Sequence, residues 1–150
     1  MATYSKPITI EEYIDAVKNR DAAKLPPSLG GSYVVCVKPF VGTQPEAIDR
    51  EDLVYIGKTE QNQVLYRATQ LLIEELGASD DDADTPKTGT RYHPGGRSIK
   101  KEHGNPGARK LFIAWQTDAC PSCEEHRVYS IALGSKKFLN QANVSFCSKH

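Results

Sequence analysis

Two short tyrosine-containing segments constrain the fold of this chain more than any other feature. One is Gly31–Val35, with the sequence Gly-Ser-Tyr-Val-Val, and the other is Val54–Thr59, with the sequence Val-Tyr-Ile-Gly-Lys-Thr. Tyrosine and β-branched residues favour strands, because their side chains pack well on a pleated surface. We therefore expect two neighbouring strands that hold the phenols of Tyr33 and Tyr55. The glycine that ends the second apolar run turns the chain toward an amphipathic helix.

Hydrophobic periodicity predicts the remaining elements. Apolar residues at helical spacing predict helices at Thr9–Leu25, Gln63–Leu76 and Pro121–Leu133. Continuous apolar runs predict strands at Ser32–Val37, Leu53–Ile56 and Lys110–Gln116, and the last is apolar enough to be central. This order predicts an α/β (α+β) protein with a small three-stranded, mainly antiparallel sheet flanked by helices.

Length and hydropathy favour one compact domain of 150 residues, with residues 1–30 as a helical N-terminal extension and residues 31–150 as the main domain. No apolar run approaches the length of a membrane span, so no membrane partner is expected. The N-terminus lacks the apolar core of a signal peptide, which predicts a cytoplasmic protein.

The formal net charge of zero hides two unlike segments. Residues 74–84 carry six acidic side chains and no basic one, whereas residues 87–110 carry seven Lys or Arg side chains and a single acid. Glycines within the basic segment let its backbone approach a phosphate closely. We expect this segment to contact a nucleic-acid backbone, through Arg91, Arg97, Lys100 and Lys101.

The two tyrosine segments, the helix behind them and later Glu and Asn residues resemble the GIY-YIG nuclease superfamily over residues 31–143. The second motif is well kept as Val54–Thr59, whereas the first has Ser32 where the family usually has isoleucine. The spacing between the motifs is also longer than usual, which an insertion at a hairpin tip explains. The resemblance implies the family's fold and a nuclease activity.

The resemblance also implies site residues. The family's arginine on the first helix corresponds to Arg67, and its following histidine or tyrosine to His93 or Tyr92. Its metal-binding glutamate corresponds to Glu125, which is followed by apolar residues at the family's spacing, with Glu124 as the alternative. A terminal asparagine corresponds to Asn140 or Asn143, of which Asn143 is assigned to DNA contact.

Phosphodiester cleavage gives these residue types their roles. One carboxylate can hold Mg²⁺ or Mn²⁺ with waters completing the coordination shell, and the ion can stabilise the leaving oxygen. Arg67 can donate two hydrogen bonds to phosphate oxygens. Tyr33 is the candidate general base, and Tyr55, Lys58 and His93 would position water or the scissile phosphate. The implied mechanism is one-metal, in-line hydrolysis.

Three of the four cysteines suggest a second metal. Cys120 and Cys123 form a C-x2-C pair, and Cys147 and His150 form a C-x2-H pair at the C-terminus, both at zinc-ligand spacing. Structural Zn²⁺ would tie the start of the glutamate helix to the tail. Buried thiols in a chance arrangement are the alternative, and Cys36, inside a strand, is expected to belong to the core.

The sequence thus predicts a divalent-metal-dependent endonuclease acting on DNA, with RNA as a substrate that the residue types also allow. Restriction, repair and mobile-element roles all fit, and a homodimer would supply double-strand cleavage. The alternative function is a catalytically inactive nucleic-acid- or protein-binding module that keeps the same fold, with or without a zinc staple. Convergence of Tyr33, Tyr55, Arg67 and Glu125 on one site would distinguish the nuclease from the binding module.

Overall fold

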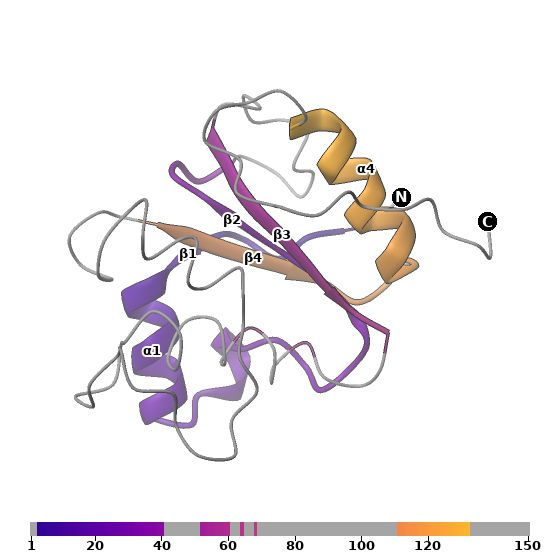
Figure 1. Cartoon of the computed structure of the whole chain (residues 1–150). Coiled ribbons are helices and arrows are strands. Elements are labelled where there is room, and N and C mark those ends of the chain that lie inside the picture. Colours follow the sequence, from indigo (N-terminus) through magenta and orange to yellow (C-terminus); the bar gives the residue numbers. More distant parts are fainter. Residues whose placement is uncertain (1–2, 41–51, 61–63, 65–67, 69–110, 133–150) are drawn as a thin grey trace, which may run out of the picture.

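The computed structural model describes residues 3–40, 52–60, 64, 68 and 111–132, which form a four-stranded sheet with a helix on each face (Figure 1). All strand pairs are antiparallel, in the order β1-β4-β2-β3. The strands are β1 (Ile8–Thr9), β2 (Gly31–Cys36), β3 (Leu53–Thr59) and β4 (Phe112–Gln116). The helices are α1 (Ile10–Lys18), a short 3-10 turn η1 (Ala22–Lys24) and α4 (Pro121–Ala132).

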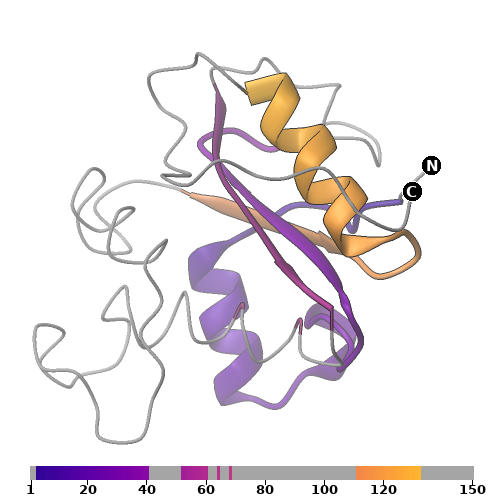
Figure 2. The same ribbon diagram turned by 45° about the vertical axis from the view of Figure 1, so that its right-hand side comes forward.

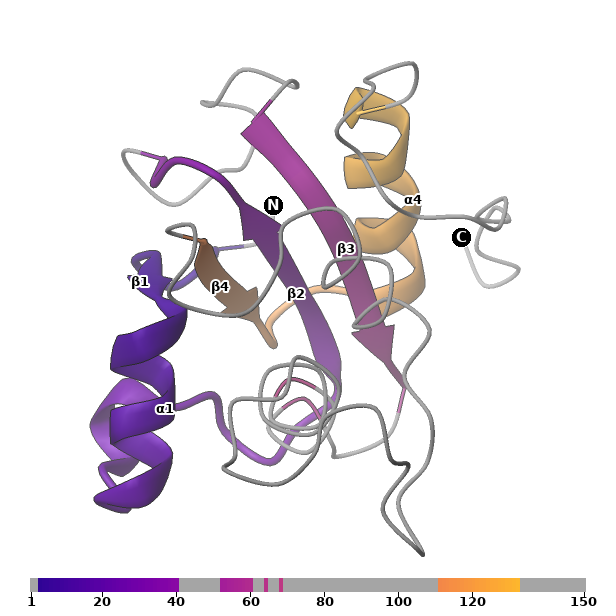
Figure 3. The same ribbon diagram turned by 60° about the vertical axis from the view of Figure 1, so that its left-hand side comes forward.

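The sheet is buried on both faces because its strands are apolar on both faces. Along β2, Tyr33 and Val35 join the core beneath α1, whereas Val34 and Cys36 join the core beneath α4. This alternation is the period of two that an extended strand imposes. Two turned views show α1 and α4 on opposite faces of the sheet, and α4 beside β3, at the edge of the described sheet (Figures 2 and 3).

Four of the predicted elements are confirmed to within a few residues: β2, β3, β4 and α4. β4 pairs on both sides, with β1 and β2, so its predicted central place is correct. β3 extends beyond the predicted Leu53–Ile56 as far as Thr59. Of the helix predicted at Gln63–Leu76, Val64 and Ala68 are described; both are helical, and both are buried in the core beneath α1.

The helix predicted at Thr9–Leu25 is wrong at its C-terminal end. Thr9 caps α1 through a reciprocal pair of hydrogen bonds with Glu12, which sets the start of the helix. The helix stops at Lys18, two residues before Arg20, which has a φ of 54°. A left-handed residue cannot continue a right-handed helix, so the chain resumes only as the short turn η1.

The prediction of three strands is also wrong, because Ile8 and Thr9 form a fourth. They pair with Ile113 and Phe112 of β4 and place the N-terminal segment in the sheet. A strand of two residues is too short to show a period of two, and its partner lies about 100 residues away along the chain. Within the described ranges, no helix is long and apolar enough to cross a membrane.

Candidate functional site

The two tyrosines of the motif segments lie together on the α1 face of the sheet. Tyr33 is opposite Gly57 in the β2–β3 register, and Tyr55 is opposite Val35. The ring centroids of Tyr33 and Tyr55 are 6.3 Å apart and their planes are inclined by 39°. Tyr33 is only 1% exposed, whereas Tyr55 is half-buried.

Gly57 is a glycine because the Tyr33 ring occupies the place of a side chain there. A Cβ added at Gly57 would lie 2.7 Å from Cε1 of Tyr33, and closer still to Cζ and to the hydroxyl oxygen. Tyr33 stands on an inner strand, so this packing carries its phenol hydroxyl across to β3. The hydroxyl therefore lies over the edge strand, one residue before Lys58.

On the other face, Lys58 joins β3 to the first turn of α4. Its Nζ donates to Oγ of Ser122 at 2.7 Å and lies 3.0 Å from Oε1 of Glu60. The Ser122 hydroxyl also donates to the Glu60 carboxylate. Burial raises the pKa of the neighbouring Glu125 carboxyl; the charge of Lys58 opposes that shift, and the charge of Glu60 adds to it. A carboxyl, a hydroxyl and an ammonium thus meet at this end of β3, and their charges act on the nearby Glu125 carboxyl.

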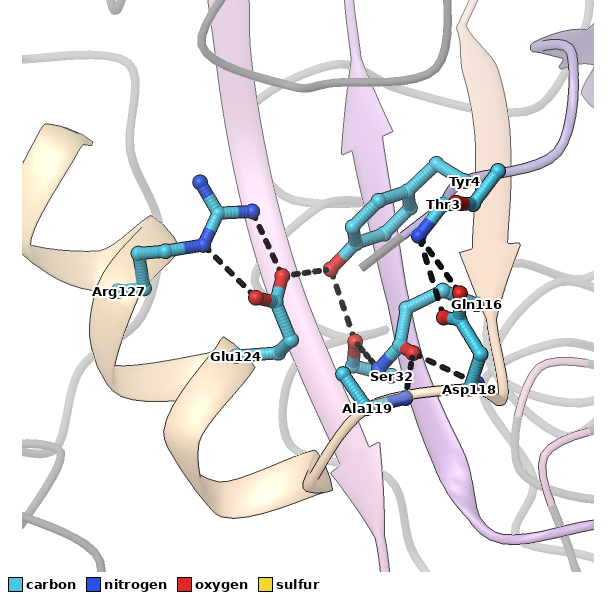
Figure 4. Close-up of polar contacts among 8 residues, drawn as sticks. All are labelled: Thr3, Tyr4, Ser32, Gln116, Asp118, Ala119, Glu124 and Arg127. Atoms are coloured by element: carbon cyan, nitrogen blue, oxygen red, sulfur yellow. Dashed lines mark hydrogen bonds and ion pairs between the residues drawn. The ribbon is translucent and has the colours of Figure 1, made fainter. Parts of the chain in front are cut away.

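Glu124 has a different environment, in a buried polar network beneath α4 (Figure 4). Its carboxylate accepts two hydrogen bonds from Arg127, at 2.8 and 2.7 Å, and one from the Tyr4 hydroxyl at 3.2 Å. The Tyr4 oxygen is 2.8 Å from Oγ of Ser32. Burial raises the pKa of Glu124, and the hydrogen bond from Tyr4 opposes this rise. Its oxygens therefore already have protein partners.

The two groups of candidate residues leave β3 on opposite faces. Tyr55 packs against the core beneath α1, whereas Lys58, three residues later, contacts α4. β3 is at the edge of the described sheet, so the two faces of the sheet meet along its outer side. The tyrosine pair is brought together on one face and Lys58, Glu60 and Ser122 on the other, and the Tyr33 hydroxyl over Gly57 is the closest approach of one group toward the other that the described contacts show.

Several predicted site residues lie outside the described residues. They are Arg67, His93, Arg91, Arg97, Lys100, Lys101, Asn143, Cys147 and His150, together with the alternatives Tyr92 and Asn140. Cys120 precedes α4 and Cys123 lies in its first turn, both half-buried. No group of three potential metal-ligating side chains occurs within the described part of the chain. The zinc prediction thus stays a prediction.

The chemistry of the donors suits a hard divalent ion at the Lys58 end of β3. Glu125 and Glu60 offer carboxylate oxygens and Ser122 a hydroxyl oxygen, which are donors that Mg²⁺ and Mn²⁺ accept. Mg²⁺ commonly uses one or two carboxylates and keeps several waters, so two carboxylates are compatible with its usual ligand number. Glu124 is the less suitable ligand, because its two-bond ion pair with Arg127 is buried, whereas Glu60 pairs with Lys58 in a more exposed position.

Four residues of the site were not predicted from the sequence: Glu60, Ser122, Tyr4 and Arg127. The spacing of Glu124 and Arg127, three residues apart on a helix, is a readable signal for an ion pair. The position of Glu60, directly after the second motif, is a weaker one. No local signal could reveal Tyr4, which reaches its partner across 120 positions of sequence.

Comparison with known proteins gives no match: no family model, no curated protein and no solved structure matches this chain at a significant level. The resemblance to GIY-YIG nucleases thus rests on the sequence motifs alone.

Proposed function

We propose that this protein is a divalent-metal-dependent endonuclease that hydrolyses phosphodiester bonds in DNA. The observation that carries the proposal is the hydrogen bond from Lys58 to Ser122, which joins the second tyrosine segment to the first turn of the helix bearing Glu125. Residues 64 positions apart are thereby combined into one charged site. The site lies on the edge strand that also receives the Tyr33 hydroxyl.

Each described residue has a role that its environment supports. Glu125 and Glu60 would hold the ion, with Ser122 as a further oxygen donor. When bound, the ion would neutralise charge on the phosphate and on the leaving 3′ oxygen. Lys58, released from Glu60, would donate to a non-bridging phosphate oxygen. Tyr33 and Tyr55 would orient the attacking water, with Tyr33 as the candidate general base.

The test is cleavage of supercoiled plasmid by the purified protein with Mg²⁺, with Mn²⁺ and with EDTA. The wild-type protein is expected to nick or linearise the plasmid only with metal, and Glu125→Gln is expected to abolish this. Glu11→Gln is the matched control, because Glu11 is an exposed glutamate in the first turn of α1, on the other face of the sheet. Thermal melts of both variants would establish that they are folded. Absence of metal-dependent cleavage by the wild-type protein would refute the proposal.

One observation favours the alternative function, a binding module that keeps the fold without activity. Tyr33 is 1% exposed and packed against Gly57, so its phenol also acts as a core residue. Ser32, which replaces the family's usual isoleucine, bonds to buried side chains instead of packing as an aliphatic residue. Retardation of DNA on a gel without cleavage under any metal condition would support this alternative.

A further inference from the structure

The N-terminal segment preceding β1 is attached to the same helix that carries Glu125. The amide of Thr3 donates to both oxygens of the Asp118 carboxylate, at 3.1 Å each, in the turn that leads into α4. The amide of Ser5 donates to the Trp115 carbonyl at 2.7 Å, and its hydroxyl accepts from the Trp115 amide at 3.0 Å. The segment therefore runs along β4 up to the start of α4.

Tyr4, between these two residues, contacts α4 directly. Its side chain is 2% exposed and belongs to the core beneath α4, where its ring meets Phe40 edge to face. Its hydroxyl donates its one hydrogen to Glu124, so the Ser32 hydroxyl must be the donor in the contact between Ser32 and Tyr4. Burial raises the pKa of Tyr4, which keeps the hydroxyl protonated and able to donate.

The same chain of hydrogen bonds continues to the turn before α4. Gln116 donates from Nε2 to Ser32 at 2.9 Å, and its Oε1 accepts from the amides of Asp118 and Ala119 at 3.0 and 2.8 Å. The network thus links the turn, the sheet and the first turn of the helix, as Figure 4 shows. The Tyr4 and Ser32 hydroxyls each donate one hydrogen bond and accept another, and such a continuous chain of buried bonds favours one arrangement.

The first turn of α4 is consequently held at two points on either side of Cys123. Ser122 is bonded to Lys58 of β3, and Glu124 to Tyr4 of the N-terminal segment. Successive helical residues point about 100° apart, so a fixed Glu124 also fixes the direction of Glu125. Ser122 and Glu125 are three residues apart and so share one face of the helix, and loss of either bond would loosen the placement of that face beside Lys58.

We propose that Tyr4 is a positioning residue, which orients Glu125 for metal binding through its hydrogen bond to Glu124. This inference rests on the proposed function, because it assigns the metal to Glu125. Groups that orient a metal ligand commonly change metal affinity by about 10- to 100-fold when they are removed. Tyr4 lies at the lower end of that range, because it acts through the neighbouring residue and does not touch Glu125.

The test measures Mn²⁺ binding to the full chain by the loss of the electron paramagnetic resonance signal of free Mn²⁺. Tyr4→Phe is expected to weaken binding about tenfold in protein shown to be folded by circular dichroism. Tyr13→Phe, a matched change at a buried tyrosine on the opposite face, should stay within twofold of wild type. Ser32→Ala, which removes the other bond to the Tyr4 oxygen, should act in the same direction as Tyr4→Phe and serves if Tyr4→Phe does not fold.

A merely structural role would lower the melting temperature of Tyr4→Phe without changing the Mn²⁺ affinity of the folded protein, and that result would overturn the inference. Plasmid cleavage is measured in parallel, so that failure of the positioning role can be distinguished from failure of the proposed nuclease function. Wild-type protein that binds Mn²⁺ through Glu125, with affinity lowered by Tyr4→Phe, would support the positioning role even if DNA is not cleaved. Wild-type protein that binds no Mn²⁺ would overturn both.

Discussion

The packing of Tyr33 on Gly57 makes a quantitative prediction about Gly57→Ala. The added methyl carbon would lie 2.7 Å from Cε1 of Tyr33, whereas ordinary van der Waals contact begins at 3.4 Å. The ring must therefore move by at least 3.4 − 2.7 = 0.7 Å at that atom, and further at Cζ and the hydroxyl. Tyr33 is 1% exposed, so its movement disturbs a packed core.

The expected cost is a net loss of stability. Overpacking a core by one methyl group costs about 1–3 kcal/mol, whereas replacing glycine by alanine within a strand stabilises by about 0.5–1 kcal/mol. Gly57→Ala should thus lower the free energy of unfolding by about 1 kcal/mol, and by no more than about 2.5 kcal/mol. In a Tyr33→Leu background the clashing atoms are absent, and the same change should be neutral or stabilising. The coupling between the two changes is expected to be about 1–3 kcal/mol.

The assay is urea unfolding of the wild type, both single variants and the double variant, followed by circular dichroism. Tyr4→Leu supplies a matched control background, because Tyr4 is a buried tyrosine on the opposite face of the sheet. Coupling with Gly57→Ala should there stay within about 0.5 kcal/mol. An equal cost of Gly57→Ala in the wild-type and Tyr33→Leu backgrounds would refute the packing, and with it the placement of the phenol hydroxyl over β3.

Three further predictions concern buried or neighbouring ionisable groups. Glu124→Ala should lower the free energy of unfolding by about 2–4 kcal/mol, because it leaves the partly buried Arg127 guanidinium without its carboxylate. Glu125→Ala should lower it by less than about 1 kcal/mol. Urea unfolding that ranks the two variants in the opposite order would contradict the buried network. In metal-free protein, Lys58→Met should raise the pKa of the Glu125 carboxyl and Glu60→Gln should lower it. Carbon NMR titration of Glu125 measures both shifts, and shifts of the same sign would contradict the proposed grouping of these charges. Burial raises the pKa of Cys36 to about 12. The thiol of the unfolded chain therefore ionises first, and the free energy of unfolding should fall by about 1 kcal/mol between pH 9 and 10, a loss that Cys36→Ala should lack in unfolding experiments.

Three strands, β2, β3 and β4, and the helix α4 were predictable because their signals are local. β2 and β4 are short apolar runs, and Pro121 marks the beginning of α4 from sequence alone. β1 was not predictable, because two residues carry no periodicity and form a strand only through β4. The premature end of α1 had a weak signal in Lys18 followed by the capping residue Asn19, whereas Arg20 is not a residue type that favours a left-handed conformation.

The sequence alone does not distinguish Glu124 from Glu125 as the metal ligand. Glu124 stands in the first helical turn and Glu125 follows it directly, so either carboxylate lies near the positive end of the helix dipole. The structure separates them: Glu124 is 5% exposed beside Tyr4 and Arg127, whereas the pKa of Glu125 responds to the charges of Lys58 and Glu60. The contact that directs Glu124 inward comes from Tyr4, which no pattern within the helix could indicate.

The position of α4 along β3 decides whether the two halves of the proposed site can act together. Tyr55 and Lys58 leave β3 on opposite faces, so a bound phosphodiester must reach both around the edge of that strand. The glycine at position 57 allows the phenol of Tyr33 to lie over the same edge, which shortens this path. The Glu125 carboxylate can stay close to the same edge only if the first turn of α4 is held in place, and Tyr4 supplies one of the two attachments of that turn. In the proposed nuclease, therefore, a residue outside both tyrosine motifs is as necessary to the geometry as the motifs themselves.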